Sequence, residues 1–147
     1  MYVNEVTVSY RLQHLPAARH AQGLITGPAQ AAAVLLPLLQ HEPVEVAILL
    51  CLNAKLKLLA FHRLTRGTLD RSILHPRDVY RTALLTNAAA VIVGHNHPSG
   101  DPSPSSEDID STRRLRNVGS LMGIELRDHI IVSPDGGWYS FNQSSLL

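Results

Sequence analysis

The chain has 147 residues and a mass of 16.1 kDa, which is the size of one ordinary domain and leaves little room for two independent cores. Hydrophobic residues make up 45% of it and charged residues 17%, so a packed core is expected rather than wholesale disorder. The formal net charge of +1 is below the Lys and Arg excess of a dedicated nucleic-acid-binding domain. The single cysteine, Cys51, excludes an intramolecular disulfide framework and a zinc site built from several thiolates.

The N-terminal residues do not resemble an export signal. Residues 1–11 alternate polar and apolar side chains and include Glu5, with no basic region followed by an apolar core. The longest strongly apolar stretch, Val46 to Leu52, is far short of the ~20 residues that span a bilayer. We therefore expect a soluble, cytoplasmic protein that does not associate with a membrane.

The first half of the chain predicts three strands and one helix. Tyr2 to Leu12 (YVNEVTVSYRL) has period-two alternation and β-branched residues, which is typical of a strand. After a connection rich in Pro, Gly and small residues, Ala29 to Gln40 is rich in Ala and Leu and predicts a helix. The apolar runs Glu45 to Leu52 and Leu56 to Leu64 predict two strands, joined in a hairpin by the intervening residues 53–55.

The second half predicts two helices, three strands and a long loop. After a turn at 66–68, the predicted elements are a helix over 76–87, a buried strand over 89–94, a Pro-rich loop over 95–104, a helix over 105–122 that stops at Gly123, and strands over 124–133 and 138–141. Helices and strands alternate, yet several strands are hairpin-linked. This order predicts an α/β (α+β) fold with a mixed, partly antiparallel sheet flanked by helices. Residues 1–28 would form an N-terminal strand and connection, and 29–147 the main domain.

The segment from Val91 to Asp110 (VIVGHNHPSGDPSPSSEDID) carries the strongest chemical signal. It places His95 and His97 two residues apart at the end of a predicted strand, where alternate side chains project to the same face. Asp108 follows in the first turn of the next predicted helix. Two imidazole nitrogens and one carboxylate oxygen suit zinc and leave a fourth coordination position open, which is the pattern of catalytic rather than structural zinc sites.

Water activated at such a metal also needs a base that takes its proton. Glu45 is the candidate, because a charged residue at the mouth of the most apolar predicted strand can face the site. Two other carboxylates are alternatives. Glu42 precedes Pro43 and is expected in the approach loop, whereas Glu107 should point about 100° away from Asp108 on the helix.

Ser105 and His129 each have two interpretations. The Ser105 hydroxyl could donate to the oxyanion that forms when water attacks a carbonyl. With Asp108 three residues later, Ser105 also matches an N-terminal helix cap, and the two roles are compatible. His129 follows Asp128 at the start of an apolar strand, so it could orient a metal ligand or be an ordinary buried histidine.

Taken together, these residues resemble the JAMM signature of MPN/JAB-domain metalloproteases. That signature is a Glu on an early strand, then His-x-His, seven residues, Ser, two residues and Asp, and here its residues are Glu45, His95, His97, Ser105 and Asp108. The wider sequence is similar to the bacterial RadC family over roughly residues 29–147. The similar stretches are HNHPSGDPSPSSEDI (95–109), HPRDVYRTAL (75–84), RDHIIVS (127–133) and GTLDRSILHPRDV (67–79).

The resemblance implies a fold, a metal and a reaction class. It implies the MPN/JAB (cytidine-deaminase-like) architecture and cleavage of an amide or isopeptide bond. It also implies zinc held by His95, His97 and Asp108, with Glu45 as general acid/base and Ser105 near the oxyanion. The opening NEVTVSY (4–10) is similar to short RadC-like proteins, so we expect a short form without the N-terminal helix-hairpin-helix region of longer members.

Three functional hypotheses follow. The first is a zinc-dependent hydrolase that acts on an unidentified peptide or protein. The second is a DNA repair or recombination accessory protein that binds DNA or a DNA-bound partner. It is motivated by a candidate basic face of Arg113, Arg114, Arg116, Lys55, Lys57, Arg63 and Arg66. The third, an inactive scaffold, is disfavoured by the complete ligand set. A homodimer is a further expectation, with the helix over 29–40 as its surface.

Overall fold

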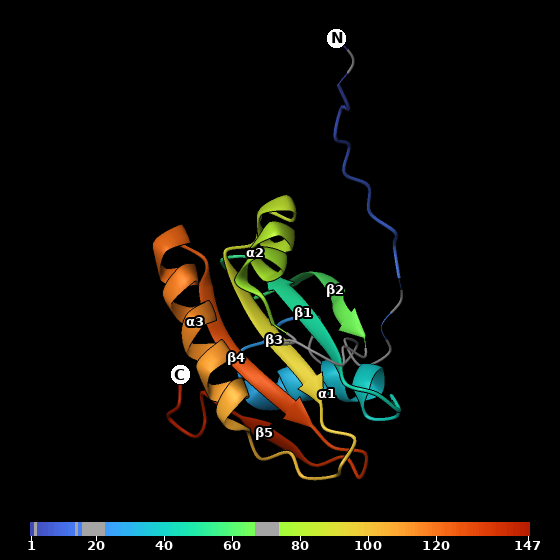
Figure 1. Ribbon diagram of the computed structural model, residues 1–147, viewed down its shortest axis with the longest axis vertical. Helices are drawn as coiled ribbons and strands as arrows, with labels where there is room; N and C mark the ends of the chain where they lie inside the picture. The colour runs from blue at the N-terminus through green and yellow to red at the C-terminus, as the bar shows by residue number, and fades with distance from the viewer. Residues whose placement is uncertain (2, 14, 16–22, 67–73) are drawn as a thin grey trace.

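The computed structural model describes residues 1, 3–13, 15, 23–66 and 74–147. Over these residues it has the elements α1 (Pro28–Leu39), β1 (Val46–Leu52), β2 (Leu58–Arg66), α2 (Pro76–Leu85), β3 (Ala90–Asn96), α3 (Ser106–Met122), β4 (Glu125–Val132) and β5 (Trp138–Ser140). The strands form one mixed sheet in the order β2-β1-β3-β4-β5, which confirms the predicted α/β class (Figure 1).

The directions of the strands bring three distant segments to one end of the sheet. β1 runs antiparallel to β3, with Ala47 opposite His95, so the start of β1 lies beside the end of β3. β3 and β4 are parallel, and α3 makes the crossover between them. The loop that leaves β3 therefore leads directly into the first turn of α3. A site at the end of β3 can draw residues from all three segments.

Helices cover both faces of the sheet. On one face α1 packs against the even-numbered side chains of β1, together with parts of β3 and β4. On the other face α2 and α3 pack against the odd-numbered side chains of β1 and β3. Since both faces are covered, β1 (VAILLCL) and β3 (AVIVGHN) are buried along their whole length, as is typical of central strands. This burial explains the continuous apolar runs in the sequence.

Proline and glycine residues in the sequence mark the ends of the helices that the structure shows. Pro28 and Pro76 stand in the first turns of α1 and α2, and Gly123 ends α3 with a φ of 68°, in the left-handed region. β3 extends two residues beyond its predicted end at Gly94, because His95 and Asn96 pair with Ile131 and Val132 of β4. The predicted turn at 66–68 falls largely outside the described residues. No helix of the described chain is both long and apolar enough to cross a bilayer.

The strand predicted over Tyr2 to Leu12 is wrong for the residues that the structure describes, 3–12. They pair with no strand, and Val6, Tyr10 and Leu12 are exposed. The Tyr10 hydroxyl donates to the Leu85 carbonyl at 2.5 Å. Alternation alone does not make a strand, because a strand also needs a partner for its backbone groups.

The close approach of α1 to β3 depends on Gly94. A Cβ added there would lie 2.5 Å from Leu35 Cδ1 and 2.7 Å from Leu35 Cδ2, and Leu35 is fully buried. Gly94→Ala should therefore lower the free energy of unfolding by about 1–3 kcal/mol, measured by urea denaturation. Gly94→Ala combined with Leu35→Ala should cost less than the sum of the two single changes. Strict additivity would contradict this steric explanation.

Candidate metal centre

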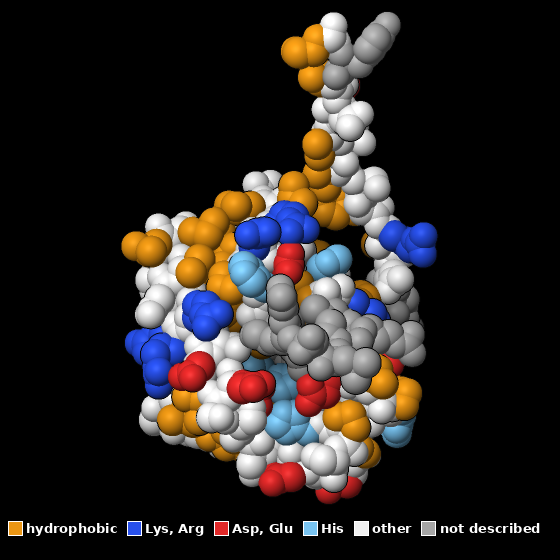
Figure 2. Space-filling model, viewed as in Figure 1, with side chains coloured by type: hydrophobic (Ala, Val, Ile, Leu, Met, Phe, Trp, Pro, Cys, Tyr) orange, Lys and Arg blue, Asp and Glu red, His pale blue; other side chains and the backbone are white. Residues whose placement is uncertain are grey.

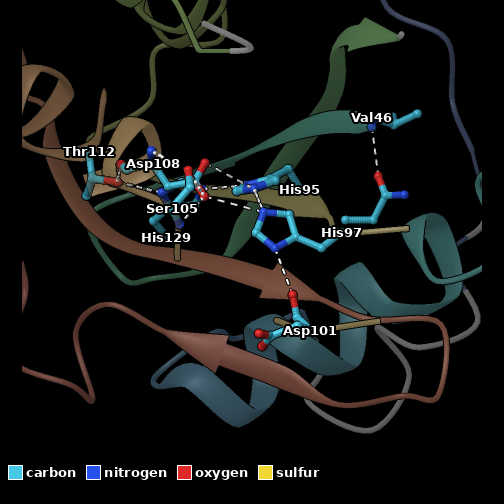
Figure 3. A network of polar contacts seen from close by, with 9 residues as sticks. Val46, His95, His97, Asp101, Ser105, Asp108, Thr112 and His129 are labelled. Atoms are coloured by element: carbon cyan, nitrogen blue, oxygen red, sulfur yellow. Dashed lines mark hydrogen bonds and ion pairs between the residues drawn. The ribbon is translucent and has the colours of Figure 1, made fainter. Parts of the chain in front are cut away.

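Three donor groups converge where β3 ends and α3 begins (Figure 3). His95 Nε2 lies 2.9 Å from His97 Nε2 and 3.3 Å from Asp108 Oδ1, and His97 Nε2 lies 3.3 Å from Asp108 Oδ2. His95 is almost fully buried, whereas His97 and Asp108 are partly exposed. The cluster can therefore hold a metal ion between rigid elements while one side stays open to solvent.

The spacing of these atoms fits a small cation. Zinc–ligand bonds of 2.0–2.1 Å at tetrahedral angles place donor atoms about 3.3 Å apart. The His97 Nδ1 atom lies 2.9 Å from the Asp101 carbonyl oxygen, which can only accept a hydrogen bond. A neutral His97 ring therefore carries its proton on Nδ1 and turns its Nε2 lone pair toward His95 and Asp108. Two nitrogens and a carboxylate at these distances repel unless a cation or a proton lies among them.

The close contacts within the cluster shift the pKa values of Asp108 and His97. Burial by itself raises the pKa of Asp108, but its interactions with His95 and His97 outweigh burial and hold that pKa well below its ordinary value of 3.8. The hydrogen bond with Asp108 in turn raises the pKa of His97 above its ordinary value of 6.5. Asp108 is thus a carboxylate at any physiological pH, and His97 Nε2 binds either a proton or a metal ion.

Ser105 caps α3 and contacts Asp108. The Ser105 hydroxyl donates to Asp108 Oδ2 at 2.7 Å and accepts from the Asp108 backbone N–H at 3.1 Å, while the Ser105 backbone N–H donates to Asp108 Oδ2 at 2.8 Å. This reciprocal pair is a capping box, which confirms the predicted helix cap. Because the hydroxyl proton is engaged with Asp108, Ser105 could serve an oxyanion only after exchanging that bond. Its catalytic role stays a prediction.

Replacing Ser105 with alanine tests how much the helix cap contributes to stability. We expect Ser105→Ala to lower the free energy of unfolding by about 1 kcal/mol, because the first turn of α3 loses its cap. Metal affinity should also fall, because the Ser105 hydroxyl is an outer hydrogen-bond partner of Asp108, although Asp108 keeps the bond from the Ser105 backbone N–H. Ser106→Ala, at the first residue of α3, is the matched control in thermal denaturation. A loss of stability equal to that of the control would argue against the capping contribution.

Glu45 immediately precedes β1 and is exposed. The pairing of Ala47 with His95 brings the start of β1, which follows Glu45, beside the end of β3, which precedes His97. The charge of Glu45 also contributes to the raised pKa of His97. Glu45 therefore lies within electrostatic range of His97, and its role as a base stays a prediction.

The alternative carboxylates are placed differently. Glu42 forms an ion pair with Arg63 of β2 at 3.0 Å, so it is directed to the other side of β1 from β3. Glu107 is exposed in the first turn of α3, next to Asp108. Among these three carboxylates, Glu45 is the one whose charge helps to raise the pKa of His97.

Two residues without an assigned role support the cluster. Asn96 is buried, and its side-chain oxygen accepts from the Val46 backbone N–H at 2.7 Å, while its amide donates to the carbonyls of Glu42 (3.2 Å) and Val44 (3.0 Å). It holds the segment that carries Glu45 against β3. Thr112 contacts both His129 and the Asp108 carbonyl. The sequence could have pointed to Thr112, because it follows Asp108 by four residues and so lies on the same helix face. Nothing in the sequence pointed to Asn96 beyond its place between the two histidines.

His129 lies beside the cluster rather than in it. Its Nε2 atom is 2.8 Å from His95 Nδ1, and its ring stacks on Phe141 with a centroid distance of 4.7 Å. Complete burial lowers the pKa of His129 well below 6.5, so the ring is neutral. On the face drawn in Figure 2, histidine side chains reach the surface in the lower centre, and acidic side chains lie on either side of them.

Comparison with known proteins adds a family to this geometry. A family model described as RadC-like JAB domain matches residues 25–146. The chain is 50% identical over 103 residues to a UPF0758 protein of Thermotoga maritima, covering 70% of this chain and 46% of that protein. It is 42% identical over 123 residues to a UPF0758 protein of Symbiobacterium thermophilum (84% and 52%) and 41% identical over 127 residues to one of Clostridium perfringens (86% and 56%).

The chain spans about half the length of these relatives. The family model, by contrast, covers nearly all of the described body of the chain, including β1, β3 and α3, which carry the metal centre. On the strength of that match, this protein belongs to the RadC-like JAB domain family.

Proposed function

We propose that this protein is a metal-dependent hydrolase, with zinc as the metal, that cleaves a peptide or isopeptide bond. The observation that carries the proposal is the convergence of His95, His97 and Asp108 at donor spacings that fit a tetrahedral ion with one open position. A structural zinc site would be closed by a fourth protein ligand, and the described residues around this cluster supply three. An open position beside a carboxylate base favours hydrolysis.

The residues in and around the cluster have different roles in the proposed reaction. A zinc ion bound there would supply Lewis acidity, which lowers the pKa of water toward ~7 and polarises a carbonyl. Glu45 accepts the proton as water attacks the scissile carbonyl carbon, and it then delivers that proton to the leaving amine nitrogen. The end of β3 and the first turn of α3 hold the ligands in place. If Ser105 releases Asp108, its hydroxyl can donate to the oxyanion.

The proposal is tested by metal analysis together with cleavage. Purified protein should contain about one zinc per chain, and a peptide library that includes lysine-linked isopeptides should be cleaved before chelation but not after it. Activity should return when zinc is added back. A protein without bound metal that also fails to bind added zinc would overturn the proposal, and so would cleavage that chelation does not affect.

The role of a DNA repair accessory is the alternative from the sequence, and it stays a prediction. Arg113, one of the basic residues that motivated it, forms an ion pair with Asp110 at 3.1 Å. DNA binding through phosphates would weaken steeply with salt. Binding of duplex, single-stranded or branched DNA at low salt, lost as salt is raised, would favour this function. Indifference to all three would remove it.

A further inference from the structure

A chain of buried hydrogen bonds leads from the backbone of one candidate ligand to the side chain of another. It runs from the Asp108 carbonyl through Thr112 and His129 to His95 (Figure 3). The side chains of Thr112, His129 and His95 are each at most 1% exposed. With no room for solvent to exchange partners, the direction of each bond follows from which atom can donate.

The direction is set at the Asp108 carbonyl, which can only accept. The Thr112 hydroxyl lies 2.6 Å from it and must be the donor. A hydroxyl has one proton, so Thr112 Oγ1 can offer His129 Nδ1, also 2.6 Å away, only a lone pair. His129 therefore donates from Nδ1.

The remaining two rings follow from this assignment. A neutral His129 ring with its proton on Nδ1 presents a lone pair at Nε2, so His95 Nδ1 donates to it over 2.8 Å. His95 then has no proton on Nε2, which is the atom that lies 2.9 Å from His97 Nε2 and 3.3 Å from Asp108 Oδ1. The stack on Phe141, with an interplanar angle of 12°, holds the His129 ring in the plane that these bonds require.

We propose that Thr112 is a positioning residue of the metal centre, which sets the tautomer of His129 and thereby directs the Nε2 lone pair of His95 toward the metal. The inference rests on the proposed metal-dependent function and adds to it a residue outside the ligand set. Without the Thr112 oxygen, His129 is free to carry its proton on Nε2 and donate to His95 Nδ1. The His95 proton would then lie on Nε2, where it blocks the metal.

Two substitutions at the same position separate the hydroxyl from the volume of the side chain. Thr112→Val replaces the hydroxyl with a methyl group of similar size, and Thr112→Ser keeps the hydroxyl. Zinc affinity is measured by competition with a chromophoric chelator. We expect Thr112→Val to weaken it by about 10–100-fold, the range for loss of an outer hydrogen-bond partner of a ligand, and Thr112→Ser to retain it.

Thr86→Val is the matched control. The Thr86 hydroxyl also donates to a carbonyl four residues earlier, that of Thr82, but it lies at the end of α2. Its removal should leave zinc affinity unchanged. Wild-type affinity in a folded Thr112→Val protein would overturn the inference, as would equal losses in the Val and Ser variants.

Nuclear magnetic resonance gives a readout that needs neither substrate nor a stable variant. Ring ¹⁵N shifts of the metal-free wild-type protein should show the proton of His129 on Nδ1. A proton on His129 Nε2 would overturn the inference even if Thr112→Val does not fold. A wild-type protein with the expected tautomer that binds no zinc would contradict the proposed function instead, so the two failures are distinguishable.

Discussion

Glu45→Gln is expected to leave zinc binding intact and to slow hydrolysis by about 10²–10⁴-fold, the range for loss of a general acid/base. Glutamine has nearly the same shape but cannot accept the proton of water at neutral pH. Glu45 lies outside the ligand set and is exposed before β1, so the fold and the three candidate ligands should stay in place when it is replaced. The measurement is the turnover rate on a cleaved library peptide, with zinc content determined on the same samples.

Glu107→Gln is the control for this experiment. Glu107 is an exposed carboxylate next to Asp108. Its replacement removes the same charge but leaves the proposed base, Glu45, in place. Its turnover should stay within a few-fold of wild type. If Glu45→Gln cleaves as fast as wild type, or if Glu107→Gln is the slower variant, the assignment of the base to Glu45 is wrong.

His97→Gln is expected to abolish the stabilisation of the fold by zinc. A ligand that binds only the folded state at about 1,000 times its Kd contributes about 4 kcal/mol, which raises the Tm of a chain of this size by roughly 10 °C. His97 supplies one of three donors, and its own contacts are the other two donors and the Asp101 carbonyl.

Thermal denaturation with and without zinc measures this effect, and His62→Gln is the control. His62 is an exposed histidine of β2, so its loss should not change the response to zinc. A zinc-induced Tm increase that survives in His97→Gln would contradict the ligand assignment. A response lost in both variants would show that the stabilisation comes from elsewhere.

The same measurement has a predicted dependence on pH. Because the hydrogen bond with Asp108 raises the pKa of His97 above 6.5, the metal-free ring holds its proton to a higher pH than an ordinary histidine. Zinc must displace that proton. The zinc-induced Tm increase should therefore be complete above the raised pKa and shrink as the pH falls through it.

Short-range signals predicted α3 correctly. A Ser–x–x–Asp cap and a terminal glycine each act within a few residues of the backbone that they order, and the helix begins and ends where they stand. The segment over residues 3–12 shows the limit of such signals. Its alternation is as regular as that of a strand, but no described strand lies beside it to accept its backbone hydrogen bonds.

The donor types of the candidate centre, two imidazoles and a carboxylate, follow from local spacing alone, because a strand end and a helix start can present them together. The surroundings of these donors depend on contacts between distant segments. Strand pairing 48 residues apart in sequence, between Ala47 and His95, brings the start of β1 to the end of β3, and packing of α3 on β4 joins Thr112 to His129. Donor types are properties of single side chains, whereas register and buried hydrogen-bond partners depend on how the whole chain packs.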